Sequence, residues 1–179
     1  MALGPRGSSG LSSASRPKHH AGSGPLSSNV RPHHASMFDI GAIALALGGL
    51  LVALASLAHL ACIALGARAY RIMGAGERMA RAVEAGKIKP TLITLAIASV
   101  LLVWALYAFS GAGLAPRLPF TELALFLIST VFLARAVAFP VLRPRFPENS
   151  TTFWLVSSSI CLVIGLLYAV GLAALWSRQ

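Results

Sequence analysis

The chain has 179 residues, of which 56% are hydrophobic and only 11% are charged, and its mean hydropathy is +0.75. Because soluble globular domains carry about 25% charged residues, this composition excludes an ordinary soluble domain. The formal charge of +10 does not indicate nucleic-acid binding, since the cations after residue 36 lie mainly at the ends of apolar runs, where they set membrane topology. We therefore expect a membrane protein with no nucleic-acid partner.

Residues 1–36 differ in composition from the rest of the chain. They contain nine Ser, five Gly, four Pro and four His, with no acidic residue and almost no large apolar side chain. Such a segment cannot bury enough surface to offset the entropy of ordering it, so we predict a disordered basic tail. Two alternatives stay open: an organelle transit peptide, and a native start at Met37 with the upstream codons untranslated.

Four apolar stretches follow, and each is long enough to cross a bilayer core, which takes about 20 helical residues. Three contain no Asp, Glu, Lys or Arg, and the fourth, Leu123–Leu142, is interrupted only by Arg135. Lipid permits only helices or closed barrels, and the sequence has no alternating period-two pattern. We therefore predict an all-α membrane protein, a four-transmembrane-helix bundle in residues 37–179. The predicted spans are about 40–66, 91–112, 122–141 and 153–176.

The connection 67–90 carries the most cations and sets the predicted orientation. Six basic residues are predicted to lie at the membrane surface, namely Arg68, Arg71, Arg78, Arg81, Lys87 and Lys89. The connection 113–121 has one arginine and 140–152 has two. By the positive-inside rule, connections 67–90 and 140–152 are cytoplasmic and both ends of the membrane domain are outside. A basic N-terminal tail would then lie on the unfavourable side, which favours the start at Met37.

The same connection predicts one short amphipathic helix lying on the inner leaflet. Its apolar face consists of Ile72, Gly76, Met79 and Val83. Glu77 and Arg81 form an i,i+4 pair off that face, and we expect Gly74 and Gly76 to allow the turn out of the first span. The predicted partners are the lipid bilayer and its anionic inner-leaflet lipids, although cations that only set topology would give the same pattern.

The few polar residues of the predicted spans lie at a similar depth in the membrane when residues are counted from the inner end of each span. His59 lies seven residues before Gly66, about 10 Å from the inner end of its span, and Arg135 lies at roughly 8 Å. Ser158 and Cys161 lie at a similar depth in the fourth span. Because ionisable groups inside a membrane usually face a bundle interior or a cavity, we predict a ligand or proton site at His59, Arg135, Ser158 and Cys161.

These residues also have plainer interpretations. Arg135 can extend its long side chain to the inner headgroups, and His59 can hydrogen-bond to a neighbouring helix as structural glue. His59, Cys62 and Cys161 could together bind a soft metal, but the His-x-x-Cys spacing is a weak signal, and we predict no metal and no cofactor. The sequence contains no nucleotide-binding glycine loop, zinc-protease, serine-hydrolase or paired-carboxylate motif, so we expect no enzyme activity.

Two segments carry a resemblance to a known group of proteins. They are "YRIMGAGERMARAVEAGKIKP" after the first span and "WALYAFSGAGL" at the end of the second. With these segments, Met37–Trp176 resembles small, uncharacterised four-helix inner-membrane proteins of bacteria. The resemblance implies a bacterial inner-membrane location and no established activity.

Two classes of function remain. We expect a structural or interaction role in the inner membrane, with a homo-oligomer or another membrane protein as partner, because one His and one Arg make a thin translocation path. The alternative is a small transporter or ligand-binding bundle that uses His59, with Arg135 as the counter-charge for an anion or a proton-linked group.

Overall fold

The computed structural model describes residues 37–145 and 149–177, and in this part of the chain every regular element is helical. The predicted tail, residues 1–36, lies outside the described residues. The helices are α1 (Met37–Leu65), α2 (Ala67–Ile72), α3 (Glu77–Glu84), α4 (Lys89–Gly111), α5 (Thr121–Val137), α6 (Phe139–Leu142) and α7 (Thr151–Trp176), with a 3-10 turn at Arg143–Arg145 between α6 and α7.

Three of the described helices are long and apolar enough to cross a membrane: Asp39–Leu65, Lys89–Gly111 and Thr151–Trp176. The predicted third span, 122–141, is interrupted. Its helix α5 has 17 residues, about 25 Å at 1.5 Å per residue, which is shorter than a hydrocarbon core of about 30 Å. Helix α5 ends at Val137 and the short α6 follows, because Pro140 has no N–H with which to continue the hydrogen-bond ladder.

Local sequence sets the ends of the long helices. Gly66 separates α1 from α2 with a φ of 72°, a conformation that glycine adopts without steric cost. Pro90 occupies the first turn of α4, where its missing N–H would have no partner in any case. Ser150 caps α7, because its Oγ accepts a hydrogen bond of 3.1 Å from the backbone N–H of Phe153.

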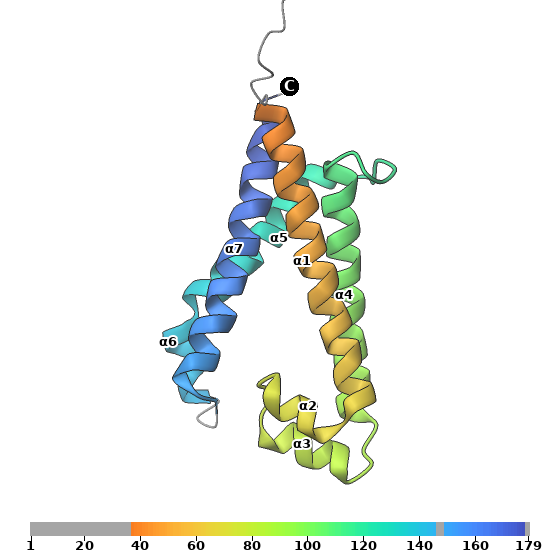
Figure 1. Cartoon of the computed structure of the whole chain (residues 1–179), viewed down its shortest axis with the longest axis vertical. Coiled ribbons are helices and arrows are strands. Elements are labelled where there is room, and N and C mark those ends of the chain that lie inside the picture. Colours follow the sequence, from red (N-terminus) through yellow and green to blue (C-terminus); the bar gives the residue numbers. More distant parts are fainter. Residues whose placement is uncertain (1–36, 146–148, 178–179) are drawn as a thin grey trace, which may run out of the picture. The chain divides into compact units, whose positions relative to one another are not determined.

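The long helices pack as two pairs, α1 with α4 and α5 with α7 (Figure 1). In the first pair, the buried Ser56 hydroxyl donates to the carbonyl of Ala98 on α4 at 2.8 Å. In the second, the buried Ser129 hydroxyl donates to the carbonyl of Gly165 on α7 at 2.9 Å. Each bond joins two neighbouring helices through a side-chain hydroxyl and a backbone carbonyl.

Helices α1 and α7 cross, and this crossing holds the two pairs together. Glycines allow the close approach, in the contacts Gly41–Ala174, Gly171–Leu45 and Gly48–Tyr168. The largest fully buried side chains of the core lie around it, including Tyr168, Leu45, Leu125 and Ile164. We call this half of the bundle, where α1 begins and α7 ends, the crossing half.

At the other end, α2 and α3 form a helical hairpin, and we call this half of the bundle the hairpin half. The single amphipathic helix predicted here is therefore wrong: Gly74 and Gly76 have φ of 72° and 86° and make the turn between two helices. The turn out of α1 is made by Gly66 instead. Met79 and Val83 pack on the buried Ala80 cluster as expected, but Ile72 is 68% exposed.

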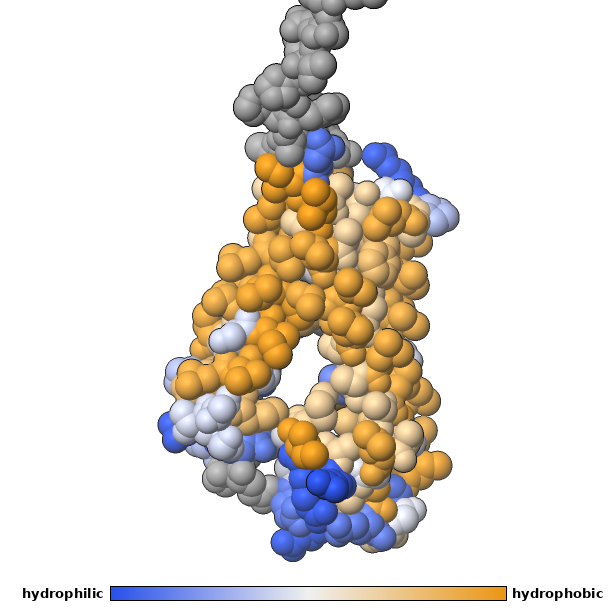
Figure 2. All heavy atoms as spheres, in the orientation of Figure 1, coloured by the Kyte–Doolittle hydropathy of each residue, from blue (hydrophilic) through white to orange (hydrophobic). Residues whose placement is uncertain are grey.

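The two helix pairs separate in the hairpin half. Figure 2 shows an opening through the protein between the α1–α4 pair and the α5–α7 pair, with apolar atoms on much of its rim. The hairpin lies at the lower end of this opening in Figure 1. It is tied to α7 by Asn149, whose Nδ2 donates to the Gly74 carbonyl at 3.0 Å, and by the ring of Phe153, which lies against Gly74.

Candidate ligand site between the helix pairs

The register of the α1–α7 crossing places His59 opposite Ser157. Gly48 lies against Tyr168, and each turn gained along α1 corresponds to one turn back along α7. Eleven residues make three helical turns, so His59 lies on the same face of α1 as Gly48, and Ser157 on the same face of α7 as Tyr168. These two side chains therefore lie at the same level, on the walls of the opening in the hairpin half.

Exposure along both walls changes at the start of the opening. On α7, Ile164 is 1% exposed, whereas Ile160, one turn earlier on the same face, is 51% exposed. On α1, Val52 is fully buried, whereas His59, two turns later, is partly exposed. The same two faces that meet in the crossing half are thus separated at the level of the polar residues.

Arg135 of α5 reaches across to α7 and lies partly buried. Its Nη2 donates to Ser157 Oγ at 3.4 Å, and its guanidinium carbon lies 5.1 Å from the centre of the Trp154 ring, within the range of a cation–π interaction. Its Nη1 is buried and has no hydrogen-bond partner among the described residues. A buried donor without an acceptor is costly, so an oxygen that reached Nη1 would satisfy a charged N–H.

His59 is held by its own helix. Its Nδ1 lies 2.7 Å from the carbonyl oxygen of Ala55, one turn earlier. A carbonyl oxygen only accepts, so Nδ1 carries the proton of this hydrogen bond; in the neutral form of the ring, Nε2 on its other side is then the acceptor. This hydrogen bond stays within α1, so it does not join α1 to a neighbouring helix. Nε2 can accept a hydrogen bond from an acid O–H.

The other predicted site residues lie on α7 near Arg135. Ser158 Oγ is buried and has no partner among the described residues, and Cys161 is a free, partly buried thiol beside the core. Cys62 is buried in the separate cluster around Tyr70 and Ala80. No group of three or more His, Cys, Asp or Glu in the described part of the chain could hold a metal ion.

The six cations predicted at the membrane surface are all exposed, but the hairpin uses two of them internally. Glu77 accepts hydrogen bonds from Arg71 at 2.8 and 3.0 Å and from Arg81 at 3.1 Å, which confirms the i,i+4 pair. Arg71 also pairs with Glu84 at 2.8 Å. The hydrogen bonds from Arg71 and then Arg81 lower the pKa of Glu77 from 4.5 to about 2, and those from Glu77 and Glu84 raise the pKa of Arg71 above its usual range.

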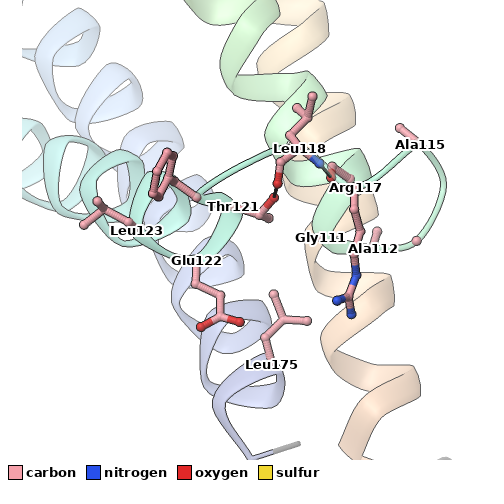
Figure 3. Close-up of a pocket in the computed structure, with 12 residues that line it drawn as sticks. Gly111, Ala112, Ala115, Arg117, Leu118, Thr121, Glu122, Leu123 and Leu175 are labelled. Atoms are coloured by element: carbon pink, nitrogen blue, oxygen red, sulfur yellow. Dashed lines mark hydrogen bonds between the residues drawn. The ribbon is translucent and has the colours of Figure 1, made fainter. Parts of the chain in front are cut away.

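A second hollow, of about 680 Å³, lies at the crossing end under the α4–α5 connection (Figure 3). Figure 3 shows Glu122 and Leu175 on one side and Arg117 on the other. Two of its hydroxyls already serve the connection, since Leu118 N–H donates to Ser110 Oγ at 2.9 Å and Thr121 Oγ1 donates to the Leu118 carbonyl at 2.7 Å. These groups shape the turn, so the opening in the hairpin half is the stronger candidate site.

Sequence reasoning missed two contributors to the candidate site. Depth along the spans does not single out Ser157 or Trp154, both of which contact Arg135. Trp154, Ser157 and Cys161 occupy positions i, i+3 and i+7 of α7 and therefore lie on one face of the helix. That spacing could have selected them once Arg135 was assumed to face α7.

Comparisons with protein-family models, with curated proteins and with solved structures give no match to this chain.

Proposed function

We propose that this protein is a four-helix bundle of the bacterial inner membrane, with α5 as the fourth membrane-inserted helix. Exposed apolar side chains cover one side of α5, at Leu123, Phe126, Leu127 and Val131. In water this surface would be costly, whereas lipid chains would solvate it. A helix shorter than the bilayer core is accommodated by local thinning or by its flanking segments.

The charge distribution supports an orientation with the hairpin and the α6–α7 connection in the cytoplasm. The hairpin and its connection to α4 carry the largest group of cations, among them the exposed Arg68, Arg78 and Lys87, which lie outside the ion pairs described above. Such cations attract anionic inner-leaflet lipids, each by about 1 kcal/mol near the surface. In this orientation the opening lies in the inner half of the bilayer.

Within the bundle, the proposed function is the binding of an acidic ligand between His59 and Arg135. The observation behind this proposal is that His59 of α1 lies at the same level as Ser157 of α7, to which Arg135 donates. The two helix pairs are separated at this level. One oxygen of a carboxyl or phosphate group would accept from the unpartnered Nη1 of Arg135. Another oxygen of the same group would share a hydrogen bond with Nε2 of His59, the proton of which comes from the acid or from the imidazolium form of the ring.

A purely structural role is the second candidate, but it needs these polar groups to join helices. The hydroxyls of Ser56 and Ser129 do so, and Nη2 of Arg135 also joins α5 to α7 through Ser157. His59 bonds within α1, and Nη1 of Arg135 has no partner among the described residues. The atoms proposed to bind the ligand, Nε2 of His59 and Nη1 of Arg135, are therefore not the atoms that join the helices.

The proposal can be tested by NMR of the full chain in detergent, with histidine labelled by ¹⁵N. Substitution His59→Gln assigns the ring signals of His59, and sodium acetate, inorganic phosphate and oleate are the acid probes. We expect at least one probe to shift the Nε2 signal in the wild-type protein, and Arg135→Gln to weaken that response about tenfold because a charged hydrogen bond is lost.

Arg143→Gln is the matched control. Arg143 is an exposed arginine that donates to a hydroxyl, Thr151 Oγ1, at 3.2 Å, as Arg135 does to Ser157. The control should keep the full response. If none of the three acids shifts the signal of His59, or if both arginine variants respond alike, acid binding at this site is wrong.

A further inference from the structure

We propose that the acidic ligand is an amphiphile, with a carboxyl or phosphate head on an acyl chain, that reaches the site sideways from the inner leaflet. This inference rests on the proposed function and specifies the class of ligand. Three features of the opening support it: its access, its rim and its closed ends.

The access to the opening is lateral. The opening passes through the protein between the two helix pairs, across the direction in which the long helices run (Figure 2). Since α1, α4 and α7 have the length and composition of membrane spans, the two mouths of the opening face hydrocarbon rather than water. A ligand that arrives through either mouth must have a part that is soluble in lipid.

The rim of the opening on α7 is apolar and accessible. Ile160 is 51% exposed and Val156 is 54% exposed, and both lie within one turn of Ser157 along α7. An acyl chain could lie against these side chains while its acidic head reaches Arg135. A small inorganic anion would leave them without contact.

Both ends of the opening are covered by protein. Towards the crossing half, the close contact of Gly171 with Leu45 and of Gly48 with Tyr168 joins α1 to α7. Towards the cytoplasm, the hairpin is tied to α7 through Gly74, by Asn149 at 3.0 Å and by the ring of Phe153. A soluble ion from the cytoplasm therefore meets the hairpin first, whereas an amphiphile in the leaflet meets an open side.

The acidic head is specified by the groups on the two walls. Nη1 of Arg135 is a charged donor without an acceptor, and no carboxylate within the described residues is in ion-pair contact with this side chain. The exposed cations of the hairpin, Arg68 and Arg78 among them, would raise the local concentration of anionic amphiphiles in the same leaflet.

The test compares oleate with acetate on the full chain in lipid nanodiscs, using an oleate analogue with a photoreactive diazirine in its chain. We expect crosslinks on α7 around Ile160, competition by unlabelled oleate, and no competition by acetate at the same concentration. Arg135→Gln should reduce crosslinking about tenfold, whereas Arg143→Gln should leave it unchanged.

A second pair of variants tests the lateral route without touching the polar groups. Ile160→Trp fills the opening beside Ser157, whereas Leu162→Trp places the same ring on α7 at a position that is 43% exposed and turned by two residues, about 200°, from Ile160. We expect Ile160→Trp to lower oleate crosslinking, and Leu162→Trp to leave both oleate crosslinking and the response of His59 to acetate unchanged.

The outcomes separate the two proposals. If acetate or phosphate shifts the His59 signal in an Arg135-dependent way but oleate crosslinks no better at Ile160 than at Leu162, the site binds acids and the amphiphile proposal is overturned. If no acid acts through Arg135 at all, both proposals fail together.

Discussion

In the crossing half, Gly171 of α7 lies against Leu45 of α1 and leaves no room for a side chain, whereas in the hairpin half Ile160, three turns earlier on the same face of α7, is 51% exposed. The same two helices thus provide a packed interface at one end and two separated walls at the other. The crossing half is joined by glycine and alanine contacts, which need shape complementarity and no charge. The hairpin half carries His59 and Arg135, whose polar atoms are only partly used by the protein.

This difference indicates a division of tasks along the bundle. Close packing of small residues joins the helices in the crossing half, where the Tyr168 hydroxyl also donates to the Trp104 carbonyl of α4 at 3.0 Å. In the hairpin half, Nε2 of His59 and Nη1 of Arg135 have no partner among the described residues and are available for a ligand. Three substitutions can break or sharpen this comparison.

Gly171→Val should give the largest loss of stability. A Cβ at this position would overlap Leu45, which is fully buried and cannot move aside, so we expect a cost of about 1–3 kcal/mol or more and a lower Tm in detergent. Ala173→Val, at an exposed position of the same helix, should change stability by no more than about 0.5 kcal/mol. Equal Tm values for the two variants would show that the crossing does not hold the bundle.

Ser129→Ala should have a smaller effect. It removes the buried hydrogen bond from α5 to the Gly165 carbonyl, and such interhelical bonds in membranes contribute about 0.6 kcal/mol on average. Ser99→Ala is the control, because Ser99 is exposed and bonds to the Leu95 carbonyl of its own helix. In thermal unfolding, we expect a lower Tm for Ser129→Ala than for Ser99→Ala. The opposite order of the two Tm values would argue that the Ser129 hydroxyl does not stabilise the packing of α5 on α7.

Glu77→Gln should give the smallest effect, and one that depends on pH. Because the pKa of Glu77 is about 2 in the folded hairpin and near 4.5 without its arginine partners, the ion pairs stabilise the hairpin above pH 4.5. That contribution is lost as the pH falls from about 4.5 to about 2.

Amide hydrogen exchange in α2 and α3 is a suitable measurement of this effect. At pH 7 the Glu77→Gln variant should exchange faster than the wild type, and the difference should shrink as the pH approaches 2. Glu122→Gln, in the first turn of α5, is a control that should leave exchange in the hairpin unchanged. A difference that persists unchanged at pH 2 would contradict the role of the Glu77 carboxylate.

The sequence by itself determined the local features of this protein. A helix in lipid satisfies its backbone within one segment, so apolar length alone predicts a span, and three of the four predicted spans have the required length in the structure. The i,i+4 pair of Glu77 and Arg81 was likewise predictable, because helical spacing alone brings the two side chains together.

Only the tertiary structure decided what depth alone could not. The break after Val137 and the separate turns at Gly66 and Gly74 depend on how the chain packs, since glycine and proline are compatible with several local courses. The lateral association of α1 with α7 depends on small residues that no hydrophobic period reveals in spans that are apolar all round. On α7 the association reaches Ile164 and does not include Ile160, one turn closer to the hairpin. The opening between the two helix pairs lies beyond this point.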